Sequence, residues 1–292
     1  MMQPHVQTFF DPATFTATHL VSDPATRAAV IIDPVLDFEP KAAKLSTISA
    51  DRVLQAVKAQ GLDLKFVLET HAHADHLSAA GYIRGRTGAK VGIGARIVEV
   101  QKQFIPVFEA DDVAADGQAF DLLLNEGDEL KLGRLSITLL HTPGHTPACV
   151  TYRIGDAAFV GDTLFMPDYG TARADFPGGD ARALYRSIRR ILALPQETRV
   201  FVGHDYLPEG RKTFGWETTI RAQREGNIHI HDGVSEAEFV AMRQARDSTL
   251  APPVLILPSL QVNIRGGALP PPSPSGRVFL KLPVTWVDAA AA

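Results

Sequence analysis

Short apolar runs, bounded by turn-forming residues, recur along the first two thirds of the chain. They predict strands at residues 17–23, 27–35, 64–70, 135–142, 149–154, 157–162 and 198–205. Apolar residues at helical spacing predict helices at residues 49–60, 76–87 and 180–194, with Asp75 near the N-terminus of the second. Strands that alternate with helices indicate a layered α/β domain.

The remaining segments have weaker patterns. Residues 101–126 are acidic and irregular, so we predict an insertion loop there. Beyond residue 210 we predict a helix at 235–248, proline-rich connections at 250–260 and 268–276, and a final strand at 277–284. We therefore expect one domain over residues 1–210 and a C-terminal extension, 211–292, packed on it.

Composition excludes several classes of protein. The 292 residues include 45% hydrophobic and 21% charged residues, which is typical of a globular protein. A net charge of -4 without a basic stretch argues against a nucleic-acid partner. No apolar run approaches the roughly 20 residues that span a bilayer, and residues 1–15 do not resemble a secretory leader, so we expect a cytoplasmic protein. The single cysteine excludes an internal disulfide and a four-cysteine zinc site.

Four of the predicted strands lead to side chains that can bind a metal. The run FVLET leads to His71, ITLLHTPG to His145, AAFVG to Asp162 and RVFVG to His204. A site assembled from loops at one edge of a sheet has this pattern. A single histidine is better explained as a core or surface residue, but a set delivered by four strand ends is not.

More ligands follow His71 directly, in the sequence HAHADH. His71, His73, Asp75 and His76 lie too close together to reach one ion from a regular helix or strand, but in a turn they can face two adjacent sites. Asp162, with two oxygens, could bridge those sites. Imidazole and carboxylate ligands suit zinc, iron or manganese.

The motifs THAHADH, HTPGHT, FVGDTLF and FVGHDY occur in this order, from residue 71 to 206. In sequence and order they resemble those of the metallo-β-lactamase superfamily. The resemblance implies an α/β fold, the four-layer αββα sandwich, with metals at one edge of its two sheets. It also implies that residues 1–210 form the catalytic domain.

The resemblance leaves two branches open. In the dinuclear zinc hydrolases of the glyoxalase II and lactonase type, a metal-bound hydroxide attacks a thioester, lactone or lactam. Their two Zn(II) sites would comprise His71, His73, His145 and Asp162, and Asp75, His76, Asp162 and His204. The persulfide (sulfur) dioxygenases hold one Fe(II), whose ligands would be His71, His145 and Asp162. There His73, Asp75, His76 and His204 would orient ligands and waters.

Flanking sequence favours the dioxygenase branch. ETHAHADHLSAAG is closer to its ETHxHADH pattern than to the THHHWDH of glyoxalase II, and ARADF at residues 172–176 resembles its GRTDF. The whole chain resembles bacterial β-lactamase-hydrolase-like proteins assigned to persulfide oxidation. Two departures are Thr171, where dioxygenases carry cysteine, and the acidic segment 101–126.

The resemblance therefore implies an Fe(II)-dependent oxidation of glutathione persulfide, or a similar small persulfide, by O2 to sulfite and thiol, in sulfide detoxification. A zinc hydrolase and a non-catalytic metal-binding protein are the alternatives. Arg173 would face a substrate carboxylate or act through Asp175, unless the two form only a surface ion pair. Tyr206 would donate a hydrogen bond in the pocket, or pack as an aromatic side chain. We also expect a homodimer.

Other motifs have simpler explanations. Cys149 is better explained by packing than by redox chemistry. The GIGAR sequence at Gly92 needs only a turn, since it lacks the third glycine of a dinucleotide site. We expect His141 to order the HTPGH loop, and His229 and His231 to lie on the surface.

Overall fold

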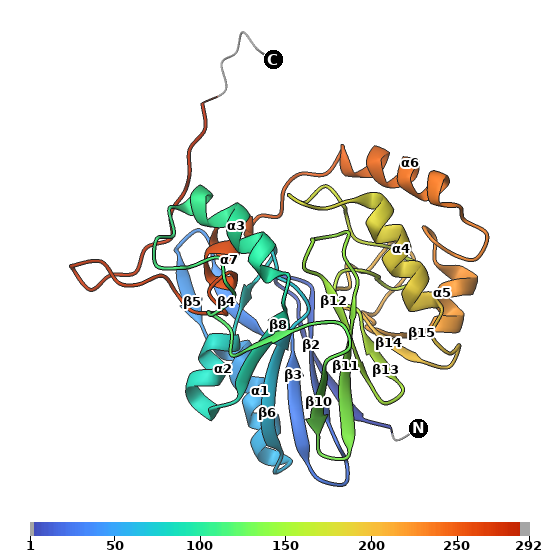
Figure 1. Cartoon of the computed structure of the whole chain (residues 1–292), viewed down its shortest axis with the longest axis horizontal. Helices are drawn as coiled ribbons and strands as arrows, with labels where there is room; N and C mark the ends of the chain where they lie inside the picture. Colours follow the sequence, from blue (N-terminus) through green and yellow to red (C-terminus); the bar gives the residue numbers. More distant parts are fainter. Residues whose placement is uncertain (1–2, 287–292) are drawn as a thin grey trace.

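The computed structural model describes residues 3–286, and two six-stranded β-sheets packed face to face form its centre (Figure 1). The first sheet has the order β1-β2-β3-β6-β8-β9, with parallel pairing from β3 to β9 and antiparallel pairing before it. Its strands are β1 (His5–Asp11), β2 (Thr16–Ser22), β3 (Ala28–Ile32), β6 (Asp63–Glu69), β8 (Lys90–Gly94) and β9 (Leu122–Leu124).

The second sheet follows the strand order β10-β11-β12-β13-β14-β15, and only the β13–β14 pair is parallel. Its strands are β10 (Glu129–Leu132), β11 (Leu135–His141), β12 (Val150–Ile154), β13 (Ala157–Phe159), β14 (Arg199–Phe201) and β15 (Glu217–Thr219). A small third sheet joins β5 (Lys44–Ser46), β4 (Val35–Glu39) and β7 (Leu77–Ser78).

Helices cover the outer faces of both sheets (Figure 1). The first sheet packs against α1 (Ile48–Ala59), α2 (Ala80–Thr87), α3 (Ile97–Phe108) and α7 (Ile256–Asn263). The second packs against α4 (Ala181–Leu192), α5 (Ile220–Gly226) and α6 (Glu236–Asp247). The layers are therefore helix, sheet, sheet and helix, and the predicted αββα sandwich is confirmed.

Strand β3 shows why the central strands are apolar throughout. Ala29 and Ile31 face the core beneath α1, whereas Val30 and Ile32 face the core between the sheets. Successive side chains of a strand point to opposite faces, so a strand covered on both sides must be apolar at every position. The same alternation holds in β14, where Phe201 faces the inner core and Val200 the outer one.

The predicted insertion loop at residues 101–126 is wrong. Its first part belongs to α3, whose buried side chains Ile97, Val100, Phe104 and Phe108 recur at helical spacing, and its end forms β9. Pro106 conceals this helix in the sequence, because proline inside a helix removes a backbone hydrogen bond. The acidic part between these elements is held by other regions, for example through the ion pair between Asp112 and Arg265.

The helix predicted from residue 76 begins only at Ala80. Leu77 and Ser78 instead form β7, which pairs with Val35 and Leu36 of β4. Asp75 is therefore not in the first turn of a helix, and residues 71–76 form an irregular loop that ends at a strand. This loop carries the cluster of metal-competent side chains.

The sequence GIGAR is part of a strand and not only of a turn. Gly92 and Gly94 lie in β8, where neighbouring side chains leave no room for a Cβ atom. A Cβ built on Gly92 would lie 2.8 Å from Leu68 Cδ2, and one on Gly94 would lie 2.6 Å from Val150 Cγ1. The glycines thus allow the two sheets and their strands to approach closely.

Two predictions for the C-terminal region are also wrong. Residues 256–263 form helix α7 and not a connection, because Pro258 lies in its first turn, where a missing N–H costs no helical hydrogen bond. Residues 277–284 form no strand within the described part of the chain, although Lys281 exchanges two hydrogen bonds with the side chain of Gln261. Phe279 and Leu282 are exposed.

The division at residue 210 and the homodimer both stay predictions, and residues 287–292 of the extension lie outside the described residues. Within residues 3–286, no helix is long and apolar enough to cross a membrane.

Asn263 of α7 connects the C-terminal region to the loop at residues 71–76. Its Oδ1 accepts a hydrogen bond from the Ser78 backbone N–H (2.8 Å), and its Nδ2 donates to the carbonyl oxygens of His73 and His76 (2.8 Å each). All three contacts are buried. One side chain near the C-terminus therefore fixes the backbone of the metal-competent loop.

We expect Asn263→Ala to lower the free energy of unfolding by at least about 2 kcal/mol, because a buried polar group without a partner costs about 1–3 kcal/mol. Urea unfolding followed by circular dichroism measures this. The exposed Gln244→Ala on α6 is the control and should change stability by less than about 0.5 kcal/mol. Equal effects of the two substitutions would contradict the role of Asn263.

Candidate metal centre

The loops that follow four strands meet at one edge of the two sheets. His71 follows β6, His145 follows β11, Asp162 follows β13 and His204 follows β14. The sheets are joined at this edge, since the Ala17 N–H donates to the carbonyl oxygen of Gly203 (2.8 Å). The structure therefore brings together the side chains that the strand ends predict.

His71, His145 and Asp162 form a first buried group, in which one ligand atom from each lies within 4.8 Å of the others. Asp162 Oδ2 lies 3.7 Å from His71 Nε2 and 3.6 Å from His145 Nε2. Two imidazoles and one carboxylate thus face a common point.

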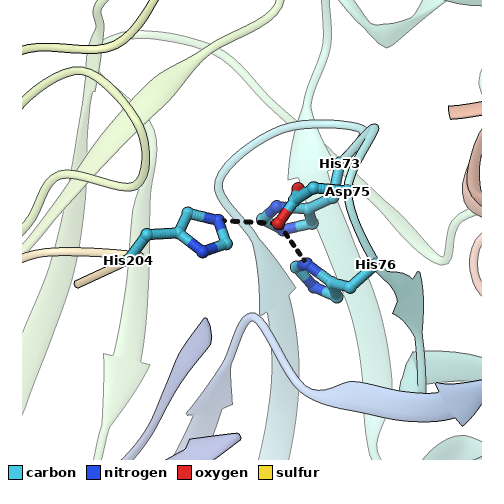
Figure 2. Close-up of side chains that lie close together, drawn as sticks. All are labelled: His73, Asp75, His76 and His204. Carbon is cyan, nitrogen blue, oxygen red and sulfur yellow. Dashed lines mark ion pairs between the residues drawn. The ribbon is translucent and has the colours of Figure 1, made fainter. Parts of the chain in front are cut away.

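A second group comprises His73, Asp75, His76 and His204 (Figure 2). Asp75 Oδ2 lies 3.2 Å from His204 Nε2 and 3.6 Å from His76 Nδ1. His204 Nε2 also lies 3.3 Å from Asp162 Oδ1. The two oxygens of Asp162 therefore face different groups, which is the bridging position that the sequence predicts.

Several polar atoms in these groups lack partners among the described residues. Within the described residues, six buried side-chain atoms of the two groups make no hydrogen bond: His71 Nε2, His73 Nδ1, Asp75 Oδ2, His76 Nε2, Asp162 Oδ1 and His204 Nε2. Buried polar groups in proteins are normally satisfied, so a cluster of unpaired nitrogen and oxygen atoms indicates a missing partner. These donor atoms fit a zinc, iron or manganese ion.

Hydrogen bonds on the far side of each ring set which nitrogen faces the cluster. His145 Nδ1 donates to the carbonyl oxygen of Arg173 (2.8 Å), and His204 Nδ1 donates to that of Phe15 (3.2 Å). In both rings Nε2 is left free as a ligand atom. Burial, followed by the neighbouring imidazoles, holds the pKa of His71 well below its usual value, and the neutral ring is the form that binds metals.

Asp33 orients both His71 and His73. Its carboxylate accepts hydrogen bonds from the Thr70 N–H (2.7 Å), the Thr70 hydroxyl (2.8 Å) and His73 Nε2 (3.1 Å). Because the Thr70 hydroxyl donates to Asp33, its oxygen accepts from His71 Nδ1 at 3.0 Å. One carboxylate thereby fixes two rings of the cluster.

A second carboxylate lies near the His73 nitrogen that Asp33 holds. Glu69 Oε2 lies 3.2 Å from His73 Nε2, close to Asp33. Burial opposes the charged form of His73, but the two carboxylates raise the pKa of its imidazole well above the usual value. Nε2 of His73 is thus turned away from the cluster, and only Nδ1 remains to face it.

A cavity of about 470 Å³ opens onto the first group. Asp162, His145, Arg173, Asp175 and Tyr206 all line it, so the three predicted catalytic residues do lie beside the cluster. Their roles stay predictions. Arg173 binds Asp175 through Nε (2.5 Å) and Nη2 (2.7 Å), so the ion pair that was the alternative prediction for Arg173 is present.

Tyr206 stacks on His204, with ring centroids 5.6 Å apart. Its hydroxyl group has no hydrogen-bond partner among residues 3–286, and burial raises its pKa well above the usual value. The ring therefore packs as an aromatic wall, while the neutral hydroxyl group stays available as a donor.

The other cysteine and histidine predictions have different outcomes. Cys149 is buried, and burial raises the pKa of its thiol to about 12, so packing is its role. His141 Nε2 donates to the carbonyl oxygen of Pro147 (3.0 Å), which orders the loop as predicted. His231 is exposed, as predicted. His229 is half-buried, and its Nδ1 accepts from the Thr171 N–H (3.0 Å), so the predicted surface position holds only in part for it.

Sequence reasoning misses the residues that hold the ligands in place. Asp33 follows the apolar run AVII, so the same rule of strand ends that finds Asp162 could have found it. Thr16 Oγ1 lies 3.3 Å from His76 Nδ1 and 3.4 Å from His204 Nδ1, but it begins a strand and gives no signal. Asn263 is distant in sequence and likewise gives none.

Known proteins match this chain over most of its length. A family model described as the metallo-beta-lactamase superfamily matches residues 13–204. The chain is 51% identical over 290 residues to a probable metallo-hydrolase of Burkholderia pseudomallei, covering 96% of this chain and 98% of that protein. It is also 51% identical over 287 residues to the beta-lactamase hydrolase-like protein of Agrobacterium fabrum, covering 98% of this chain but 66% of that protein.

Two further matches concern proteins named ETHE1. The mitochondrial persulfide dioxygenase ETHE1 of Mus musculus is 31% identical over 267 residues, covering 90% of this chain and 89% of that protein. A solved structure of ETHE1 from Myxococcus xanthus has a TM-score of 0.72 and 34% identity, covering 90% of this chain and all of that one. These matches confirm the resemblance that the motifs indicate.

We expect Asp33→Asn to weaken metal binding about 10- to 100-fold, the usual effect of removing the partner of a ligand histidine. An amide cannot accept all three hydrogen bonds, so the rings of His71 and His73 would lose their fixed orientation. Competition with a chromophoric chelator measures the affinity. The exposed Asp116→Asn is the matched control, and the same affinity in both variants would refute the prediction.

Proposed function

This chain belongs to the metallo-β-lactamase superfamily, and we propose that it is an iron-dependent persulfide dioxygenase. The proposed reaction oxidises glutathione persulfide, or a similar small persulfide, with O2 to sulfite and thiol. One observation carries the proposal: His71, His145 and Asp162 group together without His73. In a dinuclear hydrolase, His73 would join the first site.

A set of two histidines and one carboxylate is typical of non-haem Fe(II) oxygenases, where the iron supplies O2 chemistry and keeps positions open for substrate. The proposed ligand set of this chain is therefore one Fe(II) at His71, His145 and Asp162. His73 falls in the other group, and it can offer only Nδ1 to a metal, because Asp33 and Glu69 hold its Nε2. The persulfide dioxygenase of Mus musculus is a relative over 90% of the chain, which also supports this proposal.

The cavity has the character that a persulfide site requires. Phe165, Tyr169 and Phe176 contribute aromatic walls next to the first group, and the ring of Phe176 lies 5.9 Å from that of His145. Such walls limit the access of water to a reactive sulfur group. Tyr206 lines the same cavity, and its hydroxyl group can donate a hydrogen bond to a substrate anion.

Arg173 is better placed to shape this cavity than to bind substrate. Besides its two contacts with Asp175, it donates to the carbonyl oxygens of Ala251 (2.7 Å) and Leu250 (3.3 Å). These bonds occupy four of its five N–H donors. We therefore propose that Arg173 and Asp175 act by fixing the segment at residues 250–251, which forms part of the rim.

A dinuclear zinc hydrolase is the second candidate, and the close approach of Asp75, His76 and His204 favours it. With Asp162 between the two sites, these side chains could hold a second ion. A relative from Burkholderia pseudomallei is named a probable metallo-hydrolase. In that case the substrate would be a thioester or lactone.

Oxygen uptake separates the two functions. We expect iron-loaded protein, prepared without oxygen, to consume O2 when glutathione persulfide is added, with sulfite formed and about one iron per chain. In parallel, the zinc-loaded protein is tested for hydrolysis of S-lactoylglutathione. Hydrolysis of that thioester at two zinc ions per chain, without oxygen uptake by the iron form, would establish the hydrolase instead.

If Arg173 and Asp175 act by fixing residues 250–251, then Arg173→Ala and Asp175→Asn should have similar effects. Each should lower kcat/KM for glutathione persulfide about tenfold while iron content stays normal, because each releases residues 250–251. A role of Arg173 in direct substrate binding predicts a different result, namely that Arg173→Ala raises KM and Asp175→Asn does not. Steady-state oxygen uptake by both variants decides between them.

A further inference from the structure

Three arginines line the cavity beside the metal centre, and two of them already have carboxylate partners. Arg173 binds Asp175, as described above. Arg243 is almost fully buried on α6 and binds Asp247 through Nη2 at 2.7 Å. It also donates from Nη1 to the carbonyl oxygen of Thr171 at 3.1 Å.

Arg246 lies on the same helix, one turn after Arg243, and has no such partner. Among residues 3–286, no carboxylate lies within ion-pair distance of its guanidinium group, and no acceptor bonds to it. The adjacent Asp247 is engaged elsewhere, because it binds Arg243 and also accepts from the Ala174 N–H at 2.8 Å. Of the three arginines that line the cavity, Arg246 is therefore the one without a carboxylate partner among residues 3–286.

The imidazole of His229, which lies beside these arginines, is neutral and adds no charge to the cavity. Burial, followed by the charges of Arg243 and Arg246, lowers the pKa of His229 to about 4. Its Nδ1 is engaged as the acceptor for Thr171. On the α6 side of the cavity, Arg246 is thus the cationic side chain that has no partner among residues 3–286.

The same cavity contains both Arg246 and the residues of the first metal group, Asp162 and His145. Apolar side chains from residues 250–256 line it as well: Leu250, Pro252, Pro253 and Ile256. A volume of about 470 Å³ falls in the range of small-molecule sites. A molecule with its sulfur at the metal group and a carboxylate elsewhere could therefore occupy one continuous space.

We propose that Arg246 binds a carboxylate of the thiol that carries the persulfide, and so selects anionic thiols over neutral ones. The persulfide reaction in this inference rests on the proposed function, whereas binding of a carboxylate by Arg246 can be tested separately. A guanidinium group suits this role because it binds a carboxylate through two parallel hydrogen bonds. Arg173 and Arg243 suit it less, since a substrate would have to displace Asp175 or Asp247.

The kinetic test compares two substrates with iron-loaded protein: glutathione persulfide and the persulfide of thioglycerol, which has no carboxylate. We expect Arg246→Gln to raise KM for glutathione persulfide about 10- to 100-fold, with kcat nearly unchanged. KM for the neutral persulfide should change by less than about twofold. Arg246→Lys should restore part of the loss, because a lysine keeps the charge without the paired donors.

The matched control is Arg52→Gln, which removes another exposed arginine, on α1 and outside this cavity. It should leave KM for both substrates unchanged. An equal rise of KM for both substrates in Arg246→Gln, or no change for either, would overturn the proposal.

Binding without turnover keeps this inference separate from the proposed reaction. Titration calorimetry of the metal-loaded protein with glutathione itself should give a Kd about tenfold higher for Arg246→Gln than for the unaltered chain. If no variant consumes oxygen, the proposed reaction is wrong, but this difference would still support the carboxylate site. Equal values of Kd would refute the site even in an active dioxygenase.

Discussion

The cluster of buried imidazoles and carboxylates at the edge of the two sheets is the constraint on which the structure depends. Within the described residues, six ligand atoms of the cluster make no hydrogen bond to protein groups. The side chains keep their positions because their other atoms are held from behind, by Asp33, Thr70 and backbone carbonyl groups. The two sheets supply these supports from opposite sides, so their close packing is a condition for the site.

The four ligands at strand ends could be predicted from sequence because each comes soon after an apolar run. His71, His145 and His204 are local consequences of where a strand stops, and strands of one sheet end at a common edge. The sandwich itself was predicted through the family resemblance of the ordered motifs. The supports are harder to find, since Thr16 and Asn263 reach the site only through tertiary packing.

Errors in the predicted elements have two physical causes. Proline concealed two helices: Pro106 lies inside α3, and Pro258 lies in the first turn of α7, where it is tolerated. In the other cases tertiary pairing overrode local pattern. Leu77 joins a small sheet instead of beginning a helix, whereas Phe279 lies in a segment with strand-like composition but no adjacent strand in the described structure.

The link from Asn263 to His73 has a consequence for how the protein is made. The two residues are 190 positions apart in the chain. At a translation rate of about 5–20 residues per second, roughly 10–40 seconds pass between the synthesis of the histidine loop and that of its anchor. During this time the nascent chain carries the histidine loop without its final support. The loop therefore reaches its final geometry only after the segment that carries Asn263 has been synthesised.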